Sequence, residues 1–264
     1  MQATLPHGIP SNPPTGRNID PREKLIVALD VSTAAAAQKI VAAVGDSALT
    51  YKVGMQLYTA EGPQLVRDLV ASGRRVFLDL KYHDIPNTVA AAVHEAARLG
   101  VSMLTVHATG GGKMLHAAVG AARAVNPALL VLGVTVLTSL DESELEKVGF
   151  RGPVREEVLR LSALSLDNGC RGIVTSAHET ADVRAELGHN FAIVTPGVRP
   201  AGSGHGDQAR VATPAEAVAA GASHIVVGRP ITEATDPAAE ARAILRQISL
   251  DGSEDEEANP RDGL

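Results

Sequence analysis

The chain has 264 residues, of which 45% are hydrophobic and 20% charged, and its net charge is −6 at pH 7. This length and composition are typical of one large globular domain with a sizeable core. Lys and Arg do not cluster, which argues against a nucleic-acid partner. No apolar run reaches the roughly 18 residues of a membrane-spanning helix. The single cysteine, Cys170, excludes a disulfide framework and indicates a reducing, cytoplasmic compartment.

The two ends of the chain differ in composition from the rest. Residues 1–20 are rich in Pro, Gly and Asn and lack the apolar core of a signal peptide, so we expect a flexible arm. Residues 251–264 are acidic and contain Gly and Pro, which predicts a disordered tail. Residues 21–250 show no internal break in composition and are therefore predicted to form a single domain.

Short apolar runs alternate with Ala-rich segments through this domain. The predicted strands are nearly free of charge, as strands covered on both faces should be: residues 25–30, 49–53, 75–80, 103–107, 129–135, 172–175, 192–195 and 224–227. The predicted helices are residues 33–44, 62–72, 88–99, 113–124, 154–168, 177–187, 214–220 and 236–248. This alternation favours an α/β fold of the (β/α)₈ TIM-barrel type over an open doubly wound sheet.

Asp79 and Lys81, at the end of the third predicted strand, are the sharpest candidates for chemistry. Catalytic groups of a TIM barrel lie at the C-terminal ends of its strands. The two residues are two positions apart, which places them on the same side of a strand. A lysine flanked by carboxylates stays protonated, so Lys81 is expected to be a proton donor and not a Schiff-base nucleophile. The alternative is an ion pair that only closes the barrel end.

The segments after the last two predicted strands are suited to an anionic ligand. Gly228 and Arg229 offer a backbone N–H and a guanidinium where TIM barrels usually bind phosphate. The Gly-rich segment 195–208 is predicted to form a lid that carries Arg199 and Gln208. The alternatives are a tight turn with a surface arginine and a loop without a role.

The histidines leave their role open. His107 ends the fourth predicted strand, where it is either a packed, hydrogen-bonded residue or a base, and His83 follows the Asp79–Lys81 pair. The His, Asp and Glu residues do not show the spacing of a metal site, so no metal is expected. No phosphate-binding glycine motif follows a predicted strand, which argues against a nucleotide-binding sheet fold.

Six segments together resemble the orotidine 5′-phosphate decarboxylase family. They are residues 28–30 (ALD), 51–54 (YKVG), 79–88 (DLKYHDIPNT), 136–139 (VLTS), 195–200 with 206–208, and 227–230 (VGRP). The resemblance runs from residue 25 to about residue 231, and the D-x-K-x-x-D-I-P-N-T pattern is its most specific part.

The resemblance implies decarboxylation of orotidine 5′-phosphate to uridine 5′-phosphate in pyrimidine biosynthesis, without a cofactor. It implies a catalytic array of Lys52, Asp79, Lys81 and Asp84, in which Lys81 donates the proton. The implied substrate-binding residues are Asp30, Lys52, Asp79, Ile85, Thr88, Thr138, Ser139, Pro196, Arg199, Gln208, Gly228 and Arg229. It further implies an obligate homodimer, in which Asp84, Ile85 and Thr88 complete the site of the partner subunit.

Two alternatives stay open at this point. Magnesium-dependent relatives, such as 3-keto-L-gulonate 6-phosphate decarboxylase, share the D-x-K-x-x-D pattern but have a glutamate where this chain has Lys52. A lysine at that position repels a metal ion, which argues against this alternative. The other alternative is an inactive barrel that only binds a nucleotide or another protein.

Overall fold

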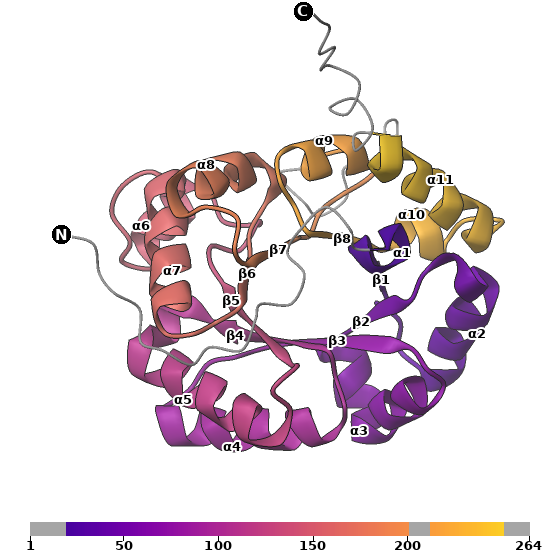
Figure 1. Ribbon diagram of the computed structural model, residues 1–264, viewed down its shortest axis with the longest axis horizontal. Helices are drawn as coiled ribbons and strands as arrows, with labels where there is room; N and C mark the ends of the chain where they lie inside the picture. The colour runs from indigo at the N-terminus through magenta and orange to yellow at the C-terminus, as the bar shows by residue number, and fades with distance from the viewer. Residues whose placement is uncertain (1–19, 201–211, 251–264) are drawn as a thin grey trace, which may run out of the picture.

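The computed structural model describes residues 20–200 and 212–250. Eight parallel strands pair in chain order, and the first pairs with the last, so that the sheet closes into a barrel surrounded by helices (Figure 1). The predicted TIM barrel is thus confirmed. The predicted N-terminal arm up to residue 19, the acidic tail and Gln208 lie outside the described residues. In the part of the chain that the structure describes, no helix is long and apolar enough to cross a membrane.

The strands agree with the predicted ranges to within two residues at either end. They are β1 (Leu25–Ala28), β2 (Thr50–Gly54), β3 (Arg75–Tyr82), β4 (Met103–His107), β5 (Leu130–Val134), β6 (Gly172–Val174), β7 (Ala192–Thr195) and β8 (His224–Val227). The close agreement has a simple cause: most of the strands are short, buried apolar runs, and their ends coincide with the change to polar residues.

The helices follow the prediction with one correction. The helices that correspond to the predicted ones are α2 (Ala34–Val44), α3 (Met55–Ala71), α4 (Pro86–Arg98), α5 (Gly111–Val125), α7 (Val154–Asp167), α8 (Ala177–Leu187), α9 (Pro214–Ala219) and α11 (Pro237–Leu250). The prediction that α3 begins at Gly62 was wrong. The helix starts seven residues earlier and continues through a kink, where Gly62 has a φ of 68° and Pro63 follows. A Gly-Pro pair usually marks a boundary, but here the flanking turns pack on the barrel and hold the kinked helix together.

Three short helices were not predicted: α1 (Pro21–Lys24), α6 (Glu142–Lys147) and α10 (Arg229–Thr232). Helices of four to six residues are too short to show a periodic pattern of apolar residues. One of them matters for the site, because α10 directly follows β8 at the C-terminal end of the barrel.

The core has two layers because successive residues of a strand point to opposite faces. Inside the barrel pack Ile26, Ala28, Phe77, Met103, Leu130, Leu132, Val194 and Val226. The residues between them in sequence, such as Leu25 and Val27 on β1, pack outward against the helices. The interior is therefore filled with apolar side chains, and polar chemistry is left to the two ends of the barrel.

We call the end formed by the first residues of the strands the floor, and the opposite end the mouth. At the floor, Thr50 and His224 are buried, and neither the Thr50 hydroxyl nor His224 Nδ1 has a hydrogen-bond partner among the described residues. Burial, with Arg75 and Lys24 nearby, lowers the pKa of His224 from 6.5 to about 4. The floor therefore holds its buried histidine in the neutral form.

Candidate active site

A cavity of about 680 Å³ opens at the mouth, which is a size typical of small-molecule sites. Ten of the residues expected to act on or bind the substrate line it: Asp30, Lys52, Asp79, Lys81, Thr138, Ser139, Pro196, Arg199, Gly228 and Arg229. Asp84, Ile85 and Thr88 are not among the described residues that line it. The barrel therefore brings together residues that are up to 199 positions apart in sequence, because the ends of all eight strands meet at the mouth.

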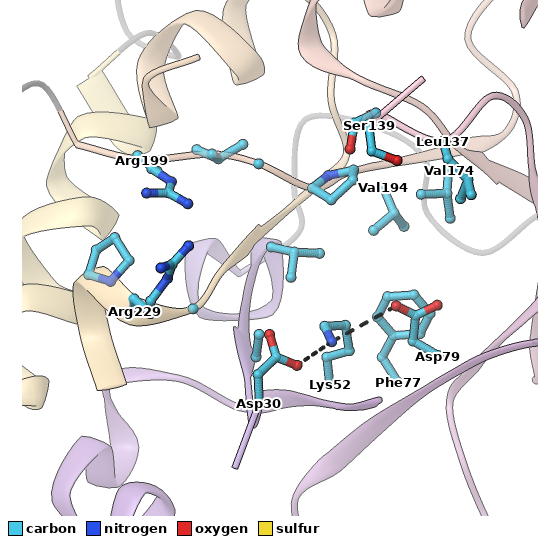
Figure 2. A pocket seen from close by; sticks show the side chains of 18 of the residues that line it. Asp30, Lys52, Phe77, Asp79, Leu137, Ser139, Val174, Val194, Arg199 and Arg229 are labelled. Atoms are coloured by element: carbon cyan, nitrogen blue, oxygen red, sulfur yellow. Dashed lines mark hydrogen bonds and ion pairs between the residues drawn. The ribbon is translucent and has the colours of Figure 1, made fainter. Parts of the chain in front are cut away.

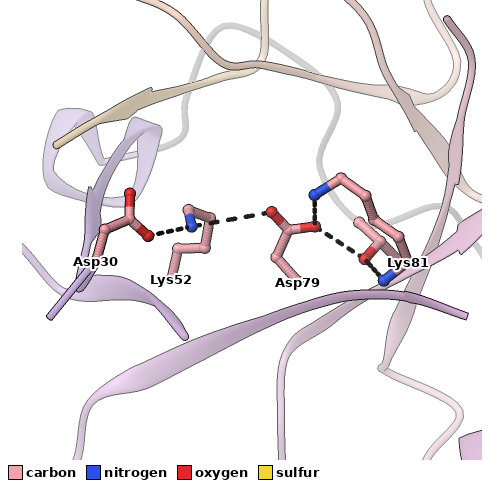
Figure 3. Close-up of polar contacts among 5 residues, drawn as sticks. Asp30, Lys52, Asp79 and Lys81 are labelled. Carbon is pink, nitrogen blue, oxygen red and sulfur yellow. Dashed lines mark hydrogen bonds and ion pairs between the residues drawn. The ribbon is translucent and has the colours of Figure 1, made fainter. Parts of the chain in front are cut away.

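Charged side chains of alternating sign run along one side of the cavity (Figure 3). Lys52 Nζ lies 2.8 Å from Asp30 Oδ1 and 3.9 Å from Asp79 Oδ2. Lys81 Nζ lies 2.8 Å from the other oxygen of the Asp79 carboxylate. The side chains of Lys52 and Asp79 are only 12% and 13% exposed. Such burial is tolerated because each ion has an opposite charge within 4 Å. We call these four residues the charged array.

The glycine at the end of β2 makes room for this array. A Cβ atom on Gly54 would lie 3.1 Å from Lys52 Nζ and 3.5 Å from Asp30 Oδ1. Any larger residue would therefore press on the contact between the ammonium and the carboxylate. Gly54 is a functional position that reasoning from charge alone does not find, although it stands in the segment Tyr51–Gly54 that carries part of the resemblance.

Asp79 and Lys81 meet as expected, although the strand that carries them is not regular. A regular strand was assumed to align them, yet the pairing of β3 with β4 is irregular: Leu78 pairs with Leu104, and Tyr82 pairs with Val106. Lys81 has a φ of 51° and is the one non-glycine residue with positive φ in the described ranges. The array thus depends on a bulge in β3, which returns the Lys81 side chain toward Asp79.

The other sides of the cavity differ in character (Figure 2). Arg199 follows β7 and Arg229 begins α10, and both guanidinium groups lie at one end of the cavity, away from Asp79. Ser139 and Leu137, from the segment after β5, lie on a further side. The cavity therefore suits an elongated ligand that carries an anion at the end near Arg199 and Arg229 and meets the charged array at the other.

The two histidines beside the array pack against each other. The rings of His83 and His107 stack with their centroids 5.5 Å apart, and Thr109 Oγ1 lies 3.2 Å from His107 Nδ1. Burial, followed by the proximity of His83 and Lys81, lowers the pKa of His107. Neither histidine lines the cavity. The structure therefore favours the interpretation of His107 as a packed residue over that of a base that contacts ligand.

The loop after β3 leaves apolar surface exposed. Asp84 Oδ1 accepts a hydrogen bond of 2.6 Å from the backbone N–H of Ile85, and Ile85 is 66% exposed. Met55, which follows the neighbouring strand β2, is 55% exposed. Both side chains follow neighbouring strands, β3 and β2, at the mouth of the barrel.

The described residues contain no group of three or more His, Cys, Asp and Glu side chains that could hold a metal ion. The two carboxylates of the charged array, Asp30 and Asp79, both contact the Lys52 ammonium. The position at which a divalent cation would meet both carboxylates is thus filled by a side-chain cation.

Known proteins share both the sequence and the fold. The family model described as "Orotidine 5'-phosphate decarboxylase / HUMPS family" matches residues 23–244. The orotidine 5′-phosphate decarboxylase of Anaeromyxobacter sp. (strain K) is 55% identical over 224 residues, which are 85% of this chain and 97% of that protein. That of Halorhodospira halophila is 53% identical over 229 residues, 87% of this chain and 97% of that protein.

A solved structure agrees in fold. The crystal structure of orotidine 5′-phosphate decarboxylase from Lactobacillus acidophilus has a TM-score of 0.78 and 38% sequence identity, and the similarity covers 86% of this chain and 99% of that one. The match of the family model, the identity over nearly the whole length of the relatives and the shared barrel lead to one assignment. This chain belongs to the orotidine 5′-phosphate decarboxylase / HUMPS family.

Proposed function

We propose that this chain decarboxylates orotidine 5′-phosphate to uridine 5′-phosphate, a step of pyrimidine biosynthesis, and that Lys81 donates the proton. The observation that carries the proposal is the charged array at the mouth, in which Lys81 and Lys52 flank Asp79. Two relatives of this chain, at 53–55% identity, are both named orotidine 5′-phosphate decarboxylase and are matched over 97% of their length. This supports the decarboxylase over the other activities of the family.

The array fits the chemistry of the reaction. The bond between C6 and the carboxylate breaks, CO₂ leaves, and the electron pair remains on C6 until the Lys81 ammonium protonates it. A fixed ammonium at about 4 Å stabilises such a carbanion by a few kcal/mol at an effective dielectric constant near 20. Each stabilisation of about 1.4 kcal/mol accelerates the step tenfold. The Asp79 carboxylate accepts a hydrogen bond of 2.8 Å from the Lys81 ammonium and so holds it in place. We propose that the substrate carboxylate binds next to Asp79.

The remaining lining residues are assigned by their place around the cavity. We propose that Asp30 and Lys52 bind the ribose hydroxyls, and that Thr138, Ser139 and Pro196 contact the pyrimidine. Arg199, Gly228 and Arg229 would bind the phosphate at the cationic end, together with Gln208 from the proposed lid, 195–208. The binding energy gained at the phosphate, which is remote from C6, can then offset the cost of organising the substrate at the charged array.

We also propose that the enzyme is a homodimer with shared sites. Asp84, Ile85 and Thr88 follow the array in sequence but do not line the cavity of their own chain. The exposed side chain of Ile85 fits an interface with a second copy, in which these residues would reach the partner's cavity.

Mixing two inactive variants tests the shared site. Lys81→Ala and Asp84→Ala remove residues of the same site that we assign to different subunits. After subunit exchange of an equal mixture, half of the dimers are mixed, and each mixed dimer has one intact site, so about a quarter of the wild-type activity should return. Each variant incubated alone, at the same total concentration, is the control. If activity does not return while exchange is demonstrated, Asp84 serves its own chain.

The reaction itself is tested by the loss of absorbance as orotidine 5′-phosphate is converted. Lys81→Ala is expected to lower kcat by at least about 10³-fold, because it removes both the proton donor and a charge at the reacting end. Lys147→Ala, which removes an exposed lysine paired with Glu144 on α6, is the matched control and should leave kcat unchanged. No turnover by the wild-type chain, or near-normal turnover by Lys81→Ala, would contradict the proposal.

The same assay separates the alternatives. A magnesium-dependent enzyme of the family would lose activity in excess chelator, whereas the proposed reaction should be unaffected. An inactive barrel would bind uridine 5′-phosphate without converting the substrate.

The single cysteine, Cys170, supports a cytoplasmic location for the enzyme. The single domain over 21–250 is part of the same proposal.

A further inference from the structure

One uncharged side chain is bonded into the charged array. Thr105 lies in the middle of β4, is fully buried, and faces the bulge of β3. We propose that Thr105 is a positioning residue: its hydroxyl fixes both the backbone of Lys81 and the carboxylate of Asp79, and thereby the place of the Lys81 ammonium. The consequence for catalysis rests on the proposed decarboxylase function.

The hydrogen bonds of Thr105 form a closed ring with the two charged residues. The backbone N–H of Lys81 donates to Thr105 Oγ1 at 2.9 Å, and the Thr105 hydroxyl lies 3.0 Å from Asp79 Oδ1. Lys81 Nζ donates to the same carboxylate oxygen at 2.8 Å. The direction is fixed, because an amide N–H can only donate, and the one hydroxyl proton of threonine is then free for the carboxylate.

The irregular strand pairing explains why a side chain is needed here. Between the pairs Leu78–Leu104 and Tyr82–Val106, three residues of β3 lie opposite the single residue Thr105. The regular ladder is interrupted over these residues, so the Lys81 amide takes a side-chain oxygen as its acceptor. The positive φ of Lys81 is sparsely populated and persists only where neighbouring groups hold it.

Removing the hydroxyl should therefore move the ammonium. Without Oγ1, the Lys81 amide loses its acceptor beside a fully buried side chain, and the bulge is expected to relax toward a conformation that satisfies the amide. A shift of about 1 Å at a reacting group costs on the order of 100-fold in rate. The hydroxyl of Thr105 bonds to Lys81 and Asp79. Arg199 and Arg229 lie at the other end of the cavity from Asp79 (Figure 2), so the phosphate end should bind as before.

Three substitutions test the role of the hydroxyl. Thr105→Val replaces the hydroxyl with a methyl group of the same shape, and Thr105→Ser retains the hydroxyl. Thr50→Val is the matched control, because Thr50 is equally buried but its hydroxyl bonds to none of the described residues. Steady-state kinetics with orotidine 5′-phosphate and crystal structures of the wild type and Thr105→Val are the two measurements.

Thr105→Val is expected to lower kcat about 10- to 100-fold while KM stays within about threefold. Thr105→Ser and Thr50→Val should both keep kcat within about threefold of the wild type. The crystal structure of Thr105→Val should show that Lys81 has left its positive φ or that its ammonium has left Asp79. A loss of activity in Thr105→Ser or Thr50→Val equal to that in Thr105→Val would overturn the proposal, since the hydroxyl would then not be the cause.

The structures decide the proposal even without turnover. If the wild-type chain does not convert the substrate, the proposed function fails, but the position of Lys81 in Thr105→Val still tests the role of Thr105. Retention of the Lys81 backbone and its contact with Asp79 in that variant overturns the proposal, whatever the kinetics. Should Thr105→Val not fold, Thr105→Cys replaces it, because a thiol is a weak donor and acceptor.

Discussion

The two ends of the barrel bury titratable groups differently: the mouth buries charged groups, and the floor buries a neutral one. At the mouth, the side chains of Lys52 and Asp79 are nearly as buried as His224 is at the floor, yet they are held as ions of alternating sign. At the floor, His224 lies near the cations Arg75 and Lys24, its Nδ1 has no hydrogen-bond partner among the described residues, and its pKa is lowered to about 4. Burial alone therefore does not decide the charge of a group.

The difference lies in what each group faces. A buried ion is tolerated where an opposite charge lies within hydrogen-bond distance, and a buried base beside cations stays neutral instead. The mouth can thus present charges to a substrate, whereas the buried histidine of the floor, His224, carries no charge. The following predictions address the array, the floor and the cationic end of the mouth in turn.

Asp79→Asn should have the largest effect, because this carboxylate is the contact that the two lysines share. Its loss leaves Lys81 without the ion pair and is expected to lower kcat by at least about 10³-fold. Asp182→Asn, which removes an exposed carboxylate paired with Arg155, is the control and should retain full turnover. More than a tenth of wild-type kcat in Asp79→Asn would show that the array does not need its central charge.

His224 should make the stability of the fold depend on pH. Its pKa is lower in the folded chain, about 4 against 6.5, so the unfolded chain binds the proton first as the pH falls. The contribution is therefore complete above pH 6.5 and is lost as the pH falls to 4, by about 3 kcal/mol in the free energy of unfolding.

Urea unfolding at pH 7 and pH 4.5 measures this loss. His224→Gln removes the titrating group, so the decline in the free energy of unfolding between these pH values should be smaller in the variant than in the wild type. His94→Gln, on the exposed face of α4, should decline as the wild type does. Parallel declines in the wild type and His224→Gln would mean that His224 is not neutral in the fold.

Arg229→Ala should have the smallest effect of the three and act on binding. Losing one charge-assisted contact to phosphate costs about 1.5–3 kcal/mol, which corresponds to a rise in KM of roughly 10- to 150-fold. The nucleoside orotidine, which lacks the phosphate, is the control substrate, and the variant should convert it as slowly as the wild type does. An equal loss with both substrates would place Arg229 at the reacting end of the cavity instead.

Most of the fold was predictable because its signals are local. Apolar runs such as β4, β7 and β8 coincide with the observed strands to the residue, and strand-end positions together with the family resemblance identified ten residues that line the cavity. The missed features depend on other parts of the chain. From the sequence alone, the Gly-Pro pair at Gly62 predicts a helix boundary, and only the packing of α3 on the barrel shows that the helix continues. From the sequence alone, Thr105 is an ordinary strand residue, and only the strand pairing shows that it lies opposite the bulge of β3.

The sequence by itself determined the alternation of strands and helices, the polar residues at the strand ends and the resemblance to a family, since these depend on residue type and spacing along the chain. Only the tertiary structure decided how Lys81 reaches Asp79. The positive φ at Lys81, the three residues opposite Thr105 and the place of Lys52 between two carboxylates all depend on which strands become neighbours. Hydrogen bonds and ion pairs act over a few ångströms in space, so residues far apart in sequence acquire their contacts only when the barrel closes.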